Sequence, residues 1–453
     1  MNKTISEKTA GENKMAVMPV KKLLLTNSIP LMLSLLIQSL YNIVDSIFVS
    51  RISEKALTAT SLVYSVQFLM IALAVGTNVG LNALLSRKVG EGKKEEACRA
   101  AMTGCILMLI TAAVFSIVGI FFSGVLAEKM TNDPEIQEMC REYMGVCLVF
   151  CYGMFLHNYG QRLLQAVGNT MQSMISLIIG ALTNLILDPV MIFGLLGCPA
   201  MGIRGAAVAT VIGQCMGAIS ALLLNRVSNP IIHLHWKGYR FLMEDVKDIY
   251  RVGMPTMVMQ AIGSVMTFAV NRLLMDVSST AVAFFGVYYK LQSFLMMPLN
   301  GLGQAAIPIA GYNLGAKAYD RIKEVWKTML PAGVIFALAG TVIFFAVPGP
   351  LLSLFAAGDE MLALGVPALR IICVTFPLAA VTMLSGYFAS GLGNGMINMI
   401  GGAIRQLVLL VPFMYLFTCA FGVSYAWYAM WISELAAAAY SLTSVKKELR
   451  KLG

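Results

Sequence analysis

The sequence predicts an all-α polytopic membrane protein, with twelve transmembrane helices arranged as two six-helix lobes. Of its 453 residues, 58% are hydrophobic and only 12% are charged. Soluble proteins carry about a quarter charged residues, so this composition excludes a soluble enzyme, a DNA-binding protein and a disordered scaffold. Long apolar segments set the number of helices, and an internal repeat divides them into two lobes.

A membrane-spanning helix needs about 20 mostly apolar residues. The run that follows residue 22 is too long for a cleavable signal peptide, so we expect it to be the first helix of the mature protein. The lengths of the apolar segments, their short polar connectors and their frequent internal glycines fit a helical bundle, whereas the strands of a β-barrel would show alternation over about ten residues. The twelve expected spans are 23–51, 56–86, 97–126, 137–163, 168–195, 202–224, 248–275, 280–310, 328–355, 361–388, 394–419 and 423–445.

The placement of basic residues predicts the orientation of these helices in the membrane. If the N-terminus lies in the cytoplasm, most of the 33 Lys and Arg residues fall in segments that face the cytoplasm. We therefore expect both termini in the cytoplasm and a multi-pass protein surrounded by the lipid bilayer. The net charge of +10 then reflects the orientation of the helices in the membrane, and no nucleic-acid partner is expected.

The two halves of the sequence align at a shift of 225 residues. Pro30 matches Pro255, Gly76 matches Gly301, and the agreement extends without gaps from Lys22 to Asn169. Because each half holds an even number of helices, both halves enter the membrane from the same side, which makes the repeat parallel. Such repeats are typical of transporters whose substrate site lies between the lobes.

The repeat also sets the expected domain bounds. These are a cytoplasmic N-terminal tail at 1–22, a first lobe at 23–224, a cytoplasmic linker at 225–247, a second lobe at 248–445 and a cytoplasmic C-terminal tail at 446–453. The nine cysteines show no metal-ligand spacing and are interpreted as buried small hydrophobic residues. No phosphate-binding loop, zinc motif or nucleophile elbow is found. We therefore expect no enzymatic activity and no cofactor.

Ionisable residues inside spanning helices are costly and therefore point to function. In the first lobe, Asp45 and Asp188 should both lie about 10 Å below the outer ends of their helices, and Thr210 about 12 Å below. Asn184 precedes Asp188 by four residues and shares its helix face. Gln38 and Asn42 share the face of Asp45 and are expected to line the cavity.

These side chains form an expected pocket of oxygen atoms. Pro189 cannot donate a backbone hydrogen bond, which frees a carbonyl group beside Asp188. Oxygen ligands suit a proton or a hard cation, and two neighbouring carboxylates in a low dielectric cannot both be ionised cheaply. The alternative is that each aspartate only caps or pins a neighbouring helix. No basic residue lies beside them in this lobe, which favours a functional role.

The second lobe carries a different set of charges. The positions that pair with Asp45 and Asp188 hold Val270 and, near a short deletion, Val411. One interpretation pairs Glu434 with Arg405 or Lys290 as an internal structural bridge. The remaining cations could instead face the cavity and favour anionic or zwitterionic groups. The buried charges expected in this lobe are Lys290, Arg370, Arg405 and Glu434.

Four sequence features carry a resemblance to a known family. They are Pro30 placed fifteen residues before Asp45, NLILDPVMIFG around Asp188, GIRGAAVAT on the sixth helix, and PIAGYNLGAK at 308–317. On these features the chain resembles the multidrug and toxic compound extrusion (MATE) family over essentially its whole length, and looks most like its DinF-like prokaryotic branch. The resemblance implies a V-shaped transporter in a prokaryotic plasma membrane, which exports drugs or metabolites against an inward flow of Na⁺ or H⁺.

The resemblance also implies roles for individual residues. Asp45, Asn184, Asp188 and Thr210 would form the cation site, and Gln38 would line its cavity. If Na⁺ is the coupling ion, Asp45 and Asp188 are its expected ligands. The NorM-like branch has acidic residues on the seventh and tenth helices that this sequence lacks, so coupling is expected to rest on the first lobe.

The expected mechanism is antiport by alternating access. Cation uptake by the two aspartates removes their repulsion and lets the first helix bend at Pro30, which expels a small-molecule substrate. The expected oligomeric state is a monomer. A lipid-linked saccharide flippase of the same superfamily is the alternative, although it would usually have more helices and a larger basic cavity. A membrane receptor or enzyme would need a catalytic constellation or a soluble domain, and neither is visible.

Overall fold

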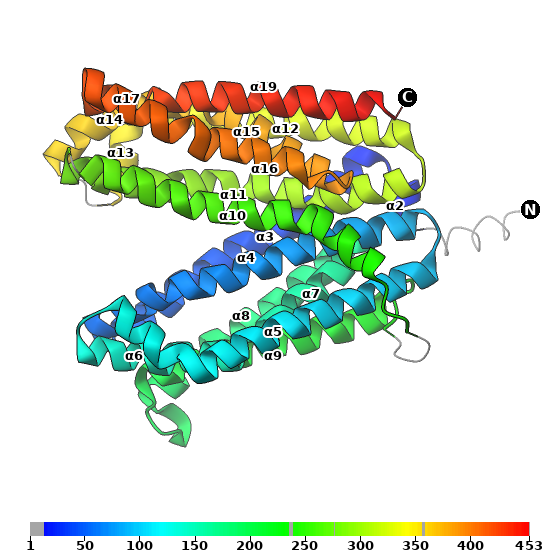
Figure 1. The fold of residues 1–453 in the computed structure, drawn as a ribbon, viewed down its shortest axis with the longest axis horizontal. Coiled ribbons are helices and arrows are strands. Elements are labelled where there is room, and N and C mark those ends of the chain that lie inside the picture. Colours follow the sequence, from blue (N-terminus) through cyan, green and yellow to red (C-terminus); the bar gives the residue numbers. More distant parts are fainter. Residues whose placement is uncertain (1–12, 235–238, 276, 356–357, 453) are drawn as a thin grey trace, which may run out of the picture. The chain divides into compact units, whose positions relative to one another are not determined.

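The computed structural model describes residues 13–234, 239–275, 277–355 and 358–452. Across these ranges the regular secondary structure consists of helices, and no strand occurs (Figure 1). The predicted all-α fold class is therefore confirmed. The expected N-terminal tail at 1–22 and the expected linker at 225–247 lie partly outside the described residues.

The chain forms two compact units. The first-half unit comprises Leu33–Gly253, and the second-half unit comprises the chain up to Met32 together with the chain from Met254 onward. Two long helices, α3 (Val20–Ser50) and α10 (Met243–Met275), therefore contribute residues to both units. The lobe bounds that the repeat predicts, 23–224 and 248–445, stay a prediction.

The first-half unit contains the later part of α3 and the start of α10. The side chain of Ser53 caps α4 by accepting a hydrogen bond from the Ala56 amide, and Asp133 caps α6 in the same way, with Pro134 in its first turn. Gly194, at φ 74°, ends α8 in the left-handed conformation that glycine adopts without strain. The complete helices of this unit are α4 (Glu54–Gly90), α5 (Lys94–Met130), α6 (Pro134–Val149), α7 (Tyr152–Ala166), α8 (Thr170–Phe193), the 3₁₀ turn η1 (Leu195–Gly197) and α9 (Gly202–Ser228).

The second-half unit includes the first turns of α3, whose Val20, Leu23 and Leu24 are buried in its hydrophobic core. Trp427 is fully buried in the same core and packs edge-on against Phe284. The helices of this unit are α2 (Lys14–Val17), α11 (Ser279–Gly315), α12 (Tyr319–Ala346), α13 (Pro348–Ser353), α14 (Asp359–Cys373), α15 (Phe376–Gly391), α16 (Gly395–Ala403), the π-helical turn η2 (Ile404–Val408), α17 (Leu410–Phe421), α18 (Val423–Ala426) and α19 (Ala429–Arg450).

Eight helices of the described chain are long and apolar enough to cross a membrane, and two bent helix pairs would raise this number to ten. The bent pairs are α6 with α7, at 45°, and α14 with α15, at 51°. They coincide with the expected spans 137–163 and 361–388, which the sequence predicts without a break. The remaining expected spans, 280–310 and 423–445, coincide with α11 and α19, which are long helices of more polar composition.

Glycines of α9 allow α8 and α9 to pack with their backbones close together. A methyl group on Gly213 would lie 2.8 Å from the Asn184 Cβ and 2.8 Å from the Gly180 carbonyl oxygen. Both distances are shorter than carbon atoms normally tolerate. Gly213 is therefore required for the approach that places Asn184 beside α9.

We predict that Gly213→Ala lowers the free energy of unfolding by about 1–3 kcal/mol, the usual cost of overpacking. The matched control is Gly286→Ala on α11, because nothing lies within 4 Å of a methyl group there. Alanine also favours a helix over glycine by about 1 kcal/mol, so the control should be neutral or stabilising. Thermal unfolding of the two variants in lipid nanodiscs measures the difference, and equal stability would contradict the packing argument.

Candidate functional site

The candidate site lies in the first-half unit, where α3, α8 and α9 carry its polar side chains. Asn184 and Asp188 are one turn apart on the buried face of α8, and Asp188 is fully buried. Thr210 is buried on the facing side of α9. Asp45 is half-buried on α3. We refer to these four residues as the aspartate site.

The side chain of Asn184 connects α8 with α9. Its Nδ2 donates to Asp188 Oδ1 at 3.2 Å and to Thr210 Oγ1 at 3.3 Å. The carboxyl groups of Asp45 and Asp188 are close enough to share a hydrogen bond when one of them is protonated. The structure thus brings together all four residues that the sequence analysis assigns to the cation site.

Three oxygen atoms of this site are buried without a protein hydrogen-bond partner. They are Asp45 Oδ1, Asn184 Oδ1 and Asp188 Oδ2. Buried polar atoms in folded proteins are nearly always paired, so each such atom calls for an explanation. All three accept hydrogen bonds but cannot donate in their usual forms. A proton or a cation is the kind of group that would satisfy them together.

The interpretation of the aspartates as helix caps finds no support in these contacts. Among the hydrogen bonds of the described residues, neither carboxylate accepts one from a backbone amide, as a helix cap would. Asp188 Oδ1 is bonded by the Asn184 side chain instead. The described residues contain no group of three or more His, Cys, Asp and Glu side chains that could hold a metal ion. The oxygen atoms that the aspartate site offers belong to two carboxyl groups, one amide and one hydroxyl.

Sequence reasoning missed the aromatic and sulfur-containing neighbours of the aspartates. Tyr41, one turn before Asp45 on α3, lies near the Thr210 hydroxyl and close enough to both carboxyl groups to interact with their charge. Cys147 on α6 lies near Asp45 and contacts Tyr143. The spacing of four residues between Tyr41 and Asp45 could have identified Tyr41. The sequence contains no comparable signal for the two residues of α6.

The other expected cavity residues on α3 lie apart from the buried contacts. Gln38 and Asn42 are exposed. Pro30 lies inside the helix and falls within the second-half unit, two residues before α3 passes into the first-half unit. These placements leave the expected roles of Gln38, Asn42 and Pro30 as predictions.

The four charged residues that the sequence analysis places inside the second lobe form one largely buried ion pair and two exposed cations. Arg405, on the π-helical turn η2, forms an ion pair through Nε with Glu434 Oε1 of α19. This is the internal bridge that the sequence analysis considers, formed with Arg405 and not with Lys290. Lys290 is exposed and lies 6.0 Å from the centre of the Phe355 ring. Arg370 is exposed, stacks over Phe345 and donates to its carbonyl oxygen at 3.3 Å.

We predict that Arg405→Leu destabilises the protein by about 3–5 kcal/mol, because it leaves Glu434 buried without its counter-charge. The double variant Arg405→Leu/Glu434→Leu should recover most of that loss, since apolar side chains can replace a buried ion pair at little cost. Thermal unfolding in nanodiscs of fixed lipid composition measures both. A double variant as unstable as the single one would show that the pair is not the stabilising feature.

Comparison with known proteins places the chain in a family. A family model described as MatE matches residues 30–190 and 255–416. The two matches begin at Pro30 and Pro255, the prolines that the internal repeat aligns. The matched segments cover well over half of the chain, and they confirm that the sequence contains the same module twice.

Individual relatives agree with this assignment. The chain is 26% identical over 404 residues to a FAD transporter of Shewanella oneidensis, which covers 87% of each protein. It is 23% identical over 420 residues to the multidrug export protein MepA of Staphylococcus aureus, which covers 92% of this chain and 91% of MepA. Its fold matches a solved multidrug resistance MATE family transporter in an outward-facing conformation, with a TM-score of 0.90, 24% identity and 98% of each chain covered. The chain therefore belongs to the MatE family of multi-pass membrane transporters.

Proposed function

We propose that this protein is a secondary active exporter that couples the efflux of small drugs or metabolites to an inward flow of H⁺ or Na⁺. The observation that carries the proposal is the set of three buried, unpaired oxygens at Asp45, Asn184 and Asp188. Acceptor atoms that converge without a donor favour the binding of a cation over an empty site. H⁺ or Na⁺ is the only small partner that the coupling chemistry requires, and no cofactor takes part.

The two carboxylates supply the coupling. Without a bound cation, two negative charges lie close together in a protein interior surrounded by lipid, which is an unfavourable state. Uptake of one cation removes this repulsion and allows the groups around Asp188 to close in. Tyr41 links this change to α9 in the proposal, because it lies near both carboxyl groups and near the Thr210 hydroxyl. A change of charge thereby becomes a change in the packing of α3 against α9.

Pro30 gives α3 a point at which to bend. Proline has no amide hydrogen and its ring displaces the preceding turn, so helices bend at this residue more easily than elsewhere. Asp45 lies fifteen residues further along the same helix. Alternating access follows if neutralisation of Asp45 repositions the part of α3 beyond Pro30, with Gln38 and Asn42 on the moving segment.

The substrate class extends to anionic as well as cationic compounds in this proposal. One relative is named a FAD transporter and another a multidrug export protein. Two exposed cations of the second half, Lys290 and Arg370, are available to attract anionic groups. We further propose that the protein functions as a monomer in a prokaryotic plasma membrane, with both termini in the cytoplasm.

We predict that Asp45→Asn and Asp188→Asn each abolish gradient-driven transport and leave expression unchanged, since an amide cannot exchange a cation at neutral pH. Proteoliposomes loaded with ethidium or with FAD provide one cationic and one anionic probe. The matched control is Asp320→Asn, which changes an exposed aspartate in the first turn of α12. Normal transport of both probes by both site variants would place the coupling elsewhere in the chain.

Separately imposed ion gradients identify the coupling ion. Under the proposal, one of two imposed gradients drives transport by the wild-type protein: a pH gradient without Na⁺, or a Na⁺ gradient at uniform pH. The gradient that drives transport identifies the coupling ion, and the Asp188→Asn variant responds to neither gradient. Initial rates of probe movement at a clamped membrane potential measure this. Transport that proceeds equally without either gradient would contradict coupled antiport while leaving the family assignment intact.

A further inference from the structure

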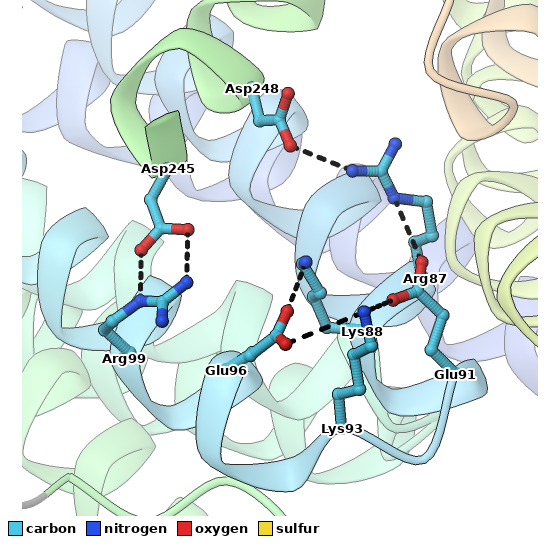
Figure 2. A network of polar contacts seen from close by, with 8 residues as sticks. All are labelled: Arg87, Lys88, Glu91, Lys93, Glu96, Arg99, Asp245 and Asp248. Atoms are coloured by element: carbon cyan, nitrogen blue, oxygen red, sulfur yellow. Dashed lines mark hydrogen bonds and ion pairs between the residues drawn. The ribbon is translucent and has the colours of Figure 1, made fainter. Parts of the chain in front are cut away.

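Two arginines of the first-half unit each use two guanidinium nitrogens in their ion pairs (Figure 2). Arg99 on α5 donates from Nε to Asp245 Oδ2 at 2.8 Å and from Nη2 to Asp245 Oδ1 at 3.2 Å. Arg87 on α4 donates from Nη2 to Asp248 Oδ2 at 2.9 Å, and its Nε lies 3.7 Å from Glu91 Oε1. Contacts that use both an inner and a terminal nitrogen are strong and fix the orientation of the guanidinium.

Arg405 of the second-half unit uses only one nitrogen. Its Nε donates to Glu434 Oε1. Neither terminal nitrogen, Nη1 or Nη2, takes part in a hydrogen bond or an ion pair with any residue that the structure describes. Glu434 Oε2 is enclosed and has no hydrogen-bond partner among the same residues. The pair therefore leaves two donor nitrogens of Arg405 unused.

The unused nitrogens can be reached from outside the polypeptide. The side chain of Arg405 is 17% exposed, against 7% for that of Glu434. Neither Nη1 nor Nη2 is among the atoms that are buried without a hydrogen-bond partner. Arg405 nevertheless lies near the middle of Gly395–Phe421, a candidate membrane span. Because an ionisable side chain at such a position is costly and usually functional, the accessible nitrogens point to a ligand.

The backbone that carries Arg405 is itself unusual. Arg405 lies on the π-helical turn η2, and such turns are rare and frequent at functional sites. At the repeat shift of 225 residues, Arg405 pairs with Gly180 on the regular helix α8. A methyl group on Gly180 would lie 2.9 Å from the Gly213 carbonyl oxygen. The second half therefore has an arginine on a distorted turn where the first half has a close backbone contact.

Two tyrosines of α11 lie beside Arg405. Tyr288 and Tyr289 are both near enough to interact with its charge. Tyr288 is 3% exposed and stacks with Phe284, so it belongs to the core. Tyr289 is 40% exposed. Its ring offers an apolar face, and its hydroxyl can donate a hydrogen bond. An accessible aromatic side chain therefore accompanies the open nitrogens.

The donor chemistry of Arg405 determines what can bind there. A guanidinium carries hydrogen-bond donors and no acceptor, so a cation cannot bind to its open nitrogens. Nη1 and Nη2 form one end of a planar fork, and their donors match two oxygens of a carboxylate or a phosphate. The ring of Tyr289 favours a ligand with an aromatic body. The class of compound that fits is an aromatic oxyanion.

We propose that Nη1 and Nη2 of Arg405 bind the phosphate or carboxylate group of an aromatic substrate, with Tyr289 beside its ring. Glu434 is a positioning residue, because it holds Arg405 through Nε and leaves the terminal nitrogens to the ligand. The inference rests on the proposed export function, since it names a class of substrate for it. The binding itself requires no ion gradient.

A pair of flavins tests the oxyanion site. Riboflavin and FMN carry the same ring system and differ by one phosphate group. Flavin fluorescence measures their binding to the protein in phosphatidylcholine nanodiscs, in a phosphate-free buffer and without gradients. We expect the wild-type protein to bind FMN at least about tenfold more tightly than riboflavin. Equal affinity for the two flavins, or no binding of FMN, would overturn the proposal.

Arg405→Lys tests the terminal nitrogens. Lysine keeps the positive charge beside Glu434 but lacks the planar fork. We expect the affinity for FMN to fall at least about tenfold, with little change in the affinity for riboflavin or in the midpoint of thermal unfolding. The matched control is Arg141→Lys, because Arg141 also pairs with a glutamate, Glu138, on an exposed surface. Unchanged FMN affinity in Arg405→Lys would exclude a site at Nη1 and Nη2.

The double variant Arg405→Leu/Glu434→Leu provides a second test that does not depend on the fold tolerating an unpaired charge. Removal of both charges should preserve the fold, since apolar side chains can replace a buried ion pair. It should also abolish the preference for FMN over riboflavin. A double variant that still prefers FMN tenfold would show that another residue binds the phosphate.

Tyr289→Leu tests the aromatic part of the proposal. Loss of the ring should weaken FMN and riboflavin by the same factor, at least about threefold, because both carry the same ring system. Unchanged affinity for both flavins would overturn the assignment of an aromatic ligand. Competition against bound FMN by phenyl phosphate and by benzoate then shows which oxyanion the site prefers. Displacement by either supports the site, and displacement by neither contradicts it.

The flavin measurements are independent of ion coupling. If the wild-type protein discriminates between FMN and riboflavin but no gradient drives transport, the oxyanion site stands and coupled antiport fails. If gradients drive the transport of ethidium but the two flavins bind equally, the oxyanion site fails and the coupling proposal stands.

Discussion

The close approach of two carboxyl groups, one fully buried and one half-buried, is the constraint on which the rest of the site depends. Asp188 is fully enclosed, and its neighbour Asp45 offers another negative group in place of a counter-charge. Asn184 satisfies one oxygen of Asp188 and reaches Thr210 with the same amide group. This arrangement requires α8 and α9 to approach closely, which explains why Gly180 and Gly213 face each other at the crossing. The glycines, the amide and the carboxylates therefore form one structural unit.

The second organising feature is the exchange of helix ends between the compact units. Each half of the repeat begins with a helix whose first turns pack in the other unit, α3 with the second half and α10 with the first. Polar contacts hold both starts, to carboxylates in α10 and to backbone carbonyls before α3. A proline follows or precedes each crossing point by two residues or fewer. Proline therefore occurs near the point at which each of these two helices passes from one unit to the other.

Much of the site could be predicted from sequence because helical spacing carries the information. Asn184 and Asp188 share a face at a spacing of four, and depth along the helices matched Asp45 with them. Spacing alone does not settle which part of a broad polar face is buried. Gln38 and Asn42 lie on the exposed part of α3 and their roles stay predictions, while Tyr41, one turn from Asp45, lies near both carboxyl groups. The breaks between α6 and α7 and between α14 and α15, and the π-helical turn at Arg405, depend on tertiary packing that leaves no local pattern.

The ion pair between Arg405 and Glu434 makes the two halves of the repeat differ in what provides the counter-charge of their carboxylates. In the first half, no salt bridge among the described residues pairs a basic side chain with Asp45 or Asp188, and in the proposed mechanism a cation from solution supplies the counter-charge. In the second half, the counter-charge of Glu434 is covalently attached and cannot diffuse away. Under the proposed coupling, ion concentration would act on the first half of the repeat through Asp45 and Asp188, and the ion pair of the second half would not respond to it.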